Sequence, residues 1–172
     1  MSGIVIPNYL DVILEHHPNL VVKCVGTASE YNDLTVESGG NLPDKASLDA
    51  LILAAKKVRM WTEIQEERTR RQGGGVFIQS ANKWFHSDQS SRIQQLGLVM
   101  MGANMPQNIN WKTMDSSYIV MTPSIALSIF NATATLDMTA FGVAEQHRVN
   151  MMQSSTPETY DYSGFWPATF GG

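Results

Sequence analysis

The pattern of apolar and polar positions changes several times along the chain, and the first changes outline a small leading module. Residues 8–16 have helical spacing, whereas residues 20–25 and 34–37 have the apolar character of strands. Pro18 separates the helical stretch from the first strand, since proline interrupts regular backbone hydrogen bonding. The pattern therefore predicts a small αββ module over residues 1–43.

A connecting helix with a Gly-rich stop is predicted over residues 44–75. Asp44 can cap its first turn, and Gly73-Gly74-Gly75 ends it. Its apolar stripe consists of Leu48, Leu51, Ile52, Ala55 and Val58. In its second half we expect acid-before-base pairs at i,i+4, Glu66 with Arg70 and Glu67 with Arg71.

The pattern of residues 76–156 predicts a hairpin-helix-hairpin-helix domain. Residues 76–78 and 83–85 flank a short polar loop, and residues 109–114 and 118–121 flank a second one, as in β-hairpins. Four aromatic residues lie on these strands, and we expect them to form one shared apolar core face in preference to a sugar-stacking platform. They are Trp84, Phe85, Trp111 and Tyr118.

The two helices of this domain each carry an apolar stripe. Ser87 or Asp88 can cap the first helix. Thr122 followed by Pro123 begins the second, which extends to about Gln153. The stripes consist of Ile93, Leu96, Gly97 and Met100 in the first helix, and of Ala126, Ile129, Phe130, Thr133, Leu136, Ala140, Phe141 and Ala144 in the second. At roughly 45 Å the second helix is longer than such a domain needs, so we expect part of it to pack on another chain.

The fold class that follows is α+β: a small N-terminal αββ module, a connecting helix, and two β-hairpins packed against two helices. Residues 157–172 form an extended aromatic tail, because proline and glycine prevent a regular helix. Its aromatic residues are Tyr160, Tyr162, Phe165, Trp166 and Phe170. We expect them to form a protein interface with Trp166 as the main anchor, although folding back over the chain's own domain is an open alternative.

Charge and composition narrow the function. A net charge of -4 and a pI near 5.5 provide no basic surplus for nucleic acid. No long apolar run suggests a membrane span. Cys24 is the single cysteine, so no internal disulfide can form.

Candidate chemistry is sparse. His86-Ser87-Asp88 holds the residue types of a nucleophilic triad, but adjacent residues do not converge on one site, and a helix cap is the simpler interpretation. The rings of His16 and His17 diverge, which disfavours a metal site. The three glycines lack the Lys-Ser/Thr of a phosphate loop. We expect no catalytic, cofactor-binding or metal-binding residue, no cofactor and no enzymatic activity.

Several strings in the second half resemble a known family. They are Lys83-Trp84-Phe85-His86-Ser87-Asp88, Ser91-Arg92, Trp111-Lys112-Thr113-Met114-Asp115 and Met121-Thr122-Pro123. In this order they resemble a phage- and prophage-encoded domain of unknown function, found in tail-region proteins near tail-fibre genes. The first module, with Pro7-Asn8-Tyr9-Leu10, is similar to the small leading module of other phage tail proteins.

The resemblance implies a structural component of a bacteriophage tail or tail tip. Such a protein acts through contacts with other phage tail proteins and as a homo-oligomer, without nucleic acid or membrane. It is made in the host cytoplasm and located in the virion. A tail-fibre assembly chaperone and a tail-attached glycan-binding module are the alternatives.

Overall fold

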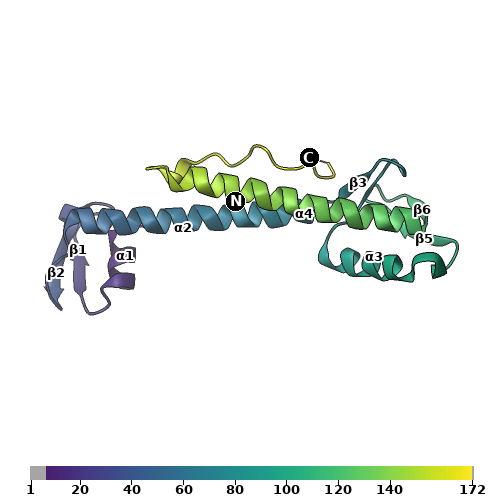
Figure 1. The fold of residues 1–172 in the computed structure, drawn as a ribbon. Coiled ribbons are helices and arrows are strands. Elements are labelled where there is room, and N and C mark those ends of the chain that lie inside the picture. The colour runs from purple at the N-terminus through teal and green to yellow at the C-terminus, as the bar shows by residue number, and fades with distance from the viewer. Residues whose placement is uncertain (1–6, 172) are drawn as a thin grey trace. The chain divides into compact units, whose positions relative to one another are not determined.

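The computed structural model describes residues 7–171 (Figure 1). The chain divides into two compact units. The first extends to Glu63 and includes Val149–Asp161, and the second comprises Ile64–Arg148 and Tyr162–Gly172. Helices α2 (Lys45–Gln72) and α4 (Pro123–Met152) contribute residues to both units.

The first unit contains the predicted αββ module. Helix α1 (Tyr9–His16) begins with a reciprocal capping box, in which Asn8 Oδ1 accepts from the Asp11 N–H at 3.1 Å and Asp11 Oδ2 accepts from the Asn8 N–H at 2.9 Å. Strands β1 (Val21–Cys24) and β2 (Leu34–Ser38) pair antiparallel, with a short 3-10 turn at Tyr31–Asp33 before β2. The core of the module is formed by Tyr9, Val12, Ile13, Leu34 and Leu48.

Polar contacts also hold the first unit together. The Tyr9 hydroxyl donates to Asp49 Oδ1 at 2.5 Å, and this bond to a carboxylate raises the pKa of Tyr9. Lys56 pairs with Glu158 at 2.6 Å, which ties the short 3-10 turn Pro157–Thr159 to α2. Asp44 caps α2 as predicted, since its Oδ1 accepts from the Ser47 N–H at 2.9 Å.

The second unit contains both predicted hairpins, and the α+β fold class is confirmed. Strand β3 (Val76–Ile78) pairs with β4 (Lys83–Phe85), and β5 (Ile109–Lys112) pairs with β6 (Tyr118–Met121). Helix α3 (Gln89–Met101), followed by a 3-10 turn at Gly102–Asn104, lies between the hairpins in sequence. Figure 1 shows α3 and the hairpins gathered around the first part of α4. The core consists of Val76, Ile78, Phe85, Met105, Met121, Ala126, Ile129 and Leu136.

The apolar stripe predicted for α3 does not face this core, so that prediction is wrong. Ile93 is 65% exposed and Met100 is 79% exposed, and Leu96 and Gly97 also face solvent. Gln95 is buried instead, because its side-chain amide donates to the His86 carbonyl at 2.8 Å. Leu98 and Val99 are the apolar residues of α3 that pack on the core.

The stripe predicted for α4 is mostly correct. Six of its members are buried, namely Ala126, Ile129, Thr133, Leu136, Ala140 and Ala144. Phe130 and Phe141 are exceptions that lie on the exposed side. A stripe as wide as the predicted one covers more of the helix circumference than the core contacts. On α2, Val58 is exposed for the same reason.

The four hairpin aromatics do not share one face. Phe85 is fully buried and Trp111 packs against the core. The Trp84 side chain lies on the face of β4 opposite to that of Phe85, because neighbouring residues of a strand point to opposite faces. Its ring lies 5.6 Å from Phe77 and 6.2 Å from Phe170, measured between centroids. Tyr118 is exposed.

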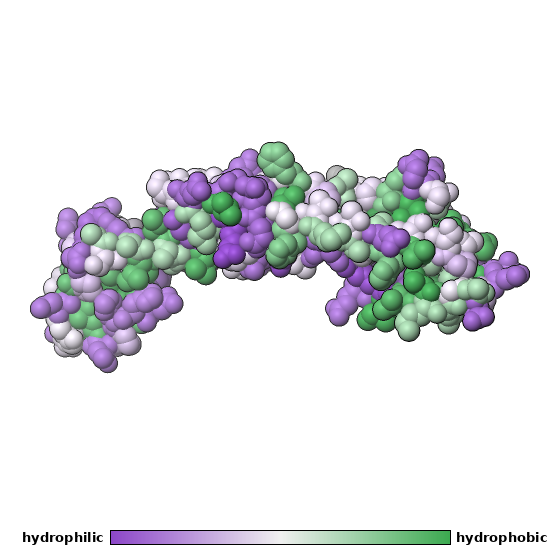
Figure 2. Space-filling model, in the orientation of Figure 1, coloured by the Kyte–Doolittle hydropathy of each residue, from purple (hydrophilic) through white to green (hydrophobic). Residues whose placement is uncertain are grey.

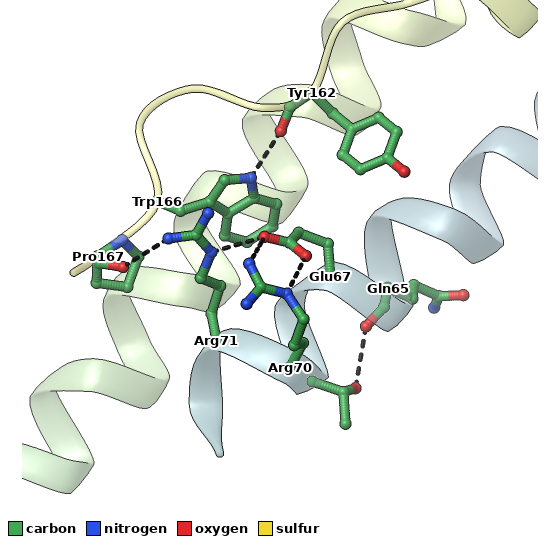
Figure 3. Close-up of polar contacts among 8 residues, drawn as sticks. Gln65, Glu67, Arg70, Arg71, Tyr162, Trp166 and Pro167 are labelled. Carbon is green, nitrogen blue, oxygen red and sulfur yellow. Dashed lines mark hydrogen bonds and ion pairs between the residues drawn. The ribbon is translucent and has the colours of Figure 1, made fainter. Parts of the chain in front are cut away.

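One of the two predicted ion pairs on α2 is replaced by another. Glu67 accepts from Arg71 at 2.6 Å as predicted, but it also accepts from Arg70 at 2.6 Å, where Glu66 had been expected (Figure 3). The nearby Arg70 lowers the pKa of Glu67. Arg92 does not pair with Asp88, whose carboxylate is engaged by Ser90 and Ser91.

We expect acid to weaken the second unit. The hydroxyls of Ser90 and Ser91 hold the pKa of Asp88 well below its usual range, and Lys83 together with Thr113 and Ser117 does the same for the pKa of Asp115. A lowered carboxyl pKa gives stability that is present above the unfolded-state pKa of about 4 and is lost as the pH falls below it.

Urea denaturation between about pH 2.5 and 7 measures this effect. The free energy of unfolding should fall on the acid side, and the slope should become shallower in Asp88→Asn. An unchanged slope in that variant would show that other carboxyls cause the loss.

Candidate protein interface

A groove of about 650 Å³ opens on the second unit. We call it the α3–α4 groove; it lies between the end of α2, the first turns of α3 and the middle of α4. Its apolar lining includes Ile93, Leu96 and Phe130, and the last two are 43% and 44% exposed. Figure 2 shows hydrophobic side chains at the surface over α3. The misplaced stripe of α3 is therefore one wall of this groove.

Arg92 holds together α3 and α4, two of the helices that line the groove. Its guanidinium donates to both carboxylate oxygens of Asp137 on α4, at 2.6 and 3.0 Å. The same side chain donates to the carbonyl of Gln72 at 2.8 Å and to the carbonyl of Ser87. A planar guanidinium suits such a forked arrangement. Arg92 thus links three helices, and the exposed stripe of α3 is held in place by it.

The Ser87 side chain, just before α3, makes hydrogen bonds to the backbone at the end of α2. Its buried hydroxyl donates to the Gln72 carbonyl at 2.6 Å and accepts from the Gly75 N–H at 2.9 Å. Gly75 has φ +94°, and a Cβ there would lie 2.2 Å from Met114 Sδ. The turn after α2 therefore requires glycine at this position.

Asp88 is the residue that caps α3. Its carboxylate accepts from the Ser91 N–H at 3.0 Å. The sequence left Ser87 and Asp88 as alternative caps, and the structure shows that Asp88 is the cap. Neither side chain is directed to a shared reaction centre with His86. The Ser87 hydroxyl bonds to the backbone of Gln72 and Gly75, and the Asp88 carboxylate bonds to Ser90 and Ser91.

Ser87→Ala should lower the free energy of unfolding by about 1–3 kcal/mol, because it leaves a buried N–H and a carbonyl without their partner. Asp88→Ala should cost about 1 kcal/mol, as the loss of a cap usually does. Chemical denaturation of both variants measures the two values. A larger loss for Asp88→Ala than for Ser87→Ala would contradict the assignment of their roles.

Helices α3 and α4, which line the groove, carry further exposed apolar side chains. Met100 and Met101 at the end of α3 and Leu127 on α4 are exposed. Together with Ile93, Leu96 and Phe130 they form what we call the α3–α4 face. Among the described residues, the charged side chains that line the groove are Arg92, Asp88 and Asp137, and Arg92 and Asp137 neutralise each other.

Thr133 adds a polar position to the groove. Its side chain is buried and lines the groove, and its hydroxyl has no hydrogen-bond partner among residues 7–171. A buried hydroxyl without a partner is unfavourable. It offers one hydrogen bond to whatever occupies the groove.

The aromatic tail folds back onto its own unit, which is one of the two arrangements left open by the sequence. The Trp166 ring lies 5.5 Å from the ring of His147, and its Nε1 donates to the Tyr162 carbonyl at 2.7 Å (Figure 3). Further along, the Phe170 N–H donates to the Gly74 carbonyl at 2.9 Å. Thr169 is buried against Gly74.

The five predicted interface residues are therefore not equivalent. Tyr160 and Tyr162 are half-buried, as is Trp166, and Phe170 contacts Trp84. Phe165 differs from all of them, since it is 90% exposed. The α3–α4 groove and Arg92 were not identified as a site from the sequence; the surplus of apolar positions on α3 was the available signal.

Residues 7–171 contain no group of three His, Cys, Asp or Glu side chains placed to hold a metal ion. None of the helices described is long and apolar enough to cross a membrane.

Comparison with known proteins adds one result. The chain matches no curated protein and no solved structure. Residues 55–164, almost two thirds of the chain, match a family described as Domain of unknown function (DUF4376), and the chain therefore belongs to this family.

Proposed function

We propose that this protein is a structural component of a bacteriophage tail or tail tip and that it works through protein-protein contacts. The observation that carries the contact role is the α3–α4 face, where an apolar stripe at helical spacing is left exposed. The assignment to a phage tail rests on the resemblance of the strings around Lys83–Asp88 and Trp111–Asp115.

The physical character of the face favours a protein partner. Contiguous exposed apolar surface is unusual on a monomer and is typical of interaction sites. Methionine is enriched in protein interfaces, and Met100 and Met101 contribute two such residues here. Nucleic acid would require a basic surface, and the groove has a single basic residue, Arg92, which is already paired.

Purified particles provide the test of the tail assignment. Mass spectrometry should find the protein at a fixed ratio to the major tail protein, in virions and not only in infected-cell lysate. Leu96→Asp with Met100→Asp should abolish incorporation, because charge on the face disfavours an apolar contact. Leu14→Asp is the matched control, since Leu14 is 70% exposed but lies on α1.

A tail-fibre assembly chaperone is the second candidate. A groove that is open to solvent in the isolated chain also suits a client that is bound and released. In that case the protein would be abundant in lysate and absent from virions, and that outcome would replace the structural assignment. Equal loss of incorporation in the Leu14→Asp control would contradict both contact proposals.

A further inference from the structure

We propose that Phe165 of one copy inserts into the α3–α4 groove of a second copy, so that the chains assemble head to tail. The proposal rests on the proposed function, because it names the partner of the same face. It starts from a projecting aromatic residue and an apolar groove that occur together in the second unit.

Phe165 is displayed on a fixed turn. Its φ is +67°, a left-handed conformation that a bulky side chain rarely adopts. The residues on either side are held: the Gly164 carbonyl accepts from His147 Nε2 at 3.0 Å, and the Pro167 carbonyl accepts from Arg71 at 3.3 Å. The side chain nevertheless remains 90% exposed. An unfavourable backbone that exposes an apolar ring is a candidate for function.

The Phe165 ring does not fill the groove of its own chain, since it is 90% exposed and is not among the residues that line the groove. The Phe165 ring lies 6.4 Å from that of His147, between centroids. The nearest groove residue on α4 is Asp137, ten positions earlier, which corresponds to about 15 Å along the helix. Phe130 is farther still. A second copy is therefore the proposed source of the ring that fills the groove.

The chemistry of the two surfaces agrees. Residues 162–170 contain no charged side chain. In the groove Arg92 and Asp137 neutralise each other, and the remaining charge, on Asp88, accepts hydrogen bonds from Ser90 and Ser91. In a chain with a net charge of -4, an uncharged segment approaches a second copy with little repulsion. The ring of Phe130 offers an aromatic partner, and the groove volume of about 650 Å³ is ample for one side chain.

Size and symmetry set the expected assembly. Phe165 alone would bury on the order of 150–250 Å², less than the roughly 800 Å² per partner of a standard interface. The exposed side chains at the rim, such as Met100 and Leu127, supply further apolar area. Because the projecting ring and the groove are different sites, the contact is heterologous and gives a ring or a filament.

The test uses two variants of the full chain and their mixture, with mass measured by light scattering and analytical ultracentrifugation. Phe165→Asn removes the ring and keeps a residue that tolerates the left-handed backbone. Ile93→Asp with Leu96→Asp places charge in the groove at exposed positions. Circular dichroism melts check that both variants fold, and Leu14→Asp is the control.

Wild type and Leu14→Asp should form concentration-dependent oligomers, and each test variant should be monomeric. The mixture should give a one-to-one dimer, because the intact ring of the groove variant fits the intact groove of the Phe165 variant. A mixture that stays monomeric, a wild type that is monomeric, or oligomers retained by Phe165→Asn would each overturn the proposal. If only the groove variant lost its oligomers, the insertion of Phe165 would be wrong, but the α3–α4 face would still be a contact surface.

Discussion

Phe85→Ala is expected to lower the free energy of unfolding of the second unit by about 3–5 kcal/mol. Phe85 is fully buried on β4, where it pairs with Val76 of β3. Removing the ring leaves a cavity between the first hairpin and α4, whose Ala126 and Ile129 are part of the same core. The groove depends on this packing, because the residues that begin α3 follow directly after β4.

Urea denaturation monitored by tryptophan fluorescence measures this loss, since Trp84 and Trp111 lie in the same unit. Phe77→Ala is the matched control: Phe77 is on the opposite face of β3 and is 39% exposed, so its loss should cost less. Equal losses in the two variants would show that the face of β3–β4 assigned to the core is wrong.

Elements defined by local chemistry could be predicted from the sequence. The caps at Asp44, Asp88 and Thr122 are side-chain interactions with the backbone three residues later, at 2.9, 3.0 and 3.2 Å. The hairpin at residues 76–85 has the predicted strands, and its loop contains Asn82 with φ +51°. Such features depend on neighbours within a few positions, and the sequence displays those directly.

The orientation of α3 depends on contacts that are distant in sequence. Arg92 reaches Asp137, which is 45 positions away, and Gln95 reaches the backbone of His86. These polar contacts direct one side of α3 inward and leave Ile93 and Met100 outside. Helical spacing identifies an apolar stripe, but it does not show whether the same chain or another one covers it.

The sequence also did not determine where the aromatic tail packs, for a related reason. Without helical or strand periodicity, residues 160–170 contain no local signal for where they pack. Their position is decided by His147, Gly74 and Arg71, which lie on elements far away in the sequence. Phe165 stands out only when the backbone is known, because its φ and exposure are not visible in the sequence.

Truncation after Asp161, which removes residues 162–172, is expected to destabilise the second unit by about 2–4 kcal/mol. The half-buried Trp166 loses part of the roughly 1.5–3 kcal/mol that a fully buried large apolar side chain contributes. The hydrogen bonds to the carbonyls of Gly164 and Pro167 add about 0.5–1.5 kcal/mol each. The truncation also removes the Phe170 N–H that donates to the Gly74 carbonyl. The melting temperature should therefore fall, as followed by circular dichroism.

The same truncation should also abolish oligomers, because Phe165 is lost with the tail. Phe165→Asn separates the two effects, since its ring is exposed and its removal should change the mass of the assembly but leave the melting temperature near that of wild type. Trp166→Ala should do the reverse: Trp166 contacts His147 of its own chain, so its loss should lower the melting temperature while the assembly persists below it. If truncation left the melting temperature unchanged and reduced only the mass, the tail would not be packed on its own unit. Trp166 would then have no role in the stability of the second unit.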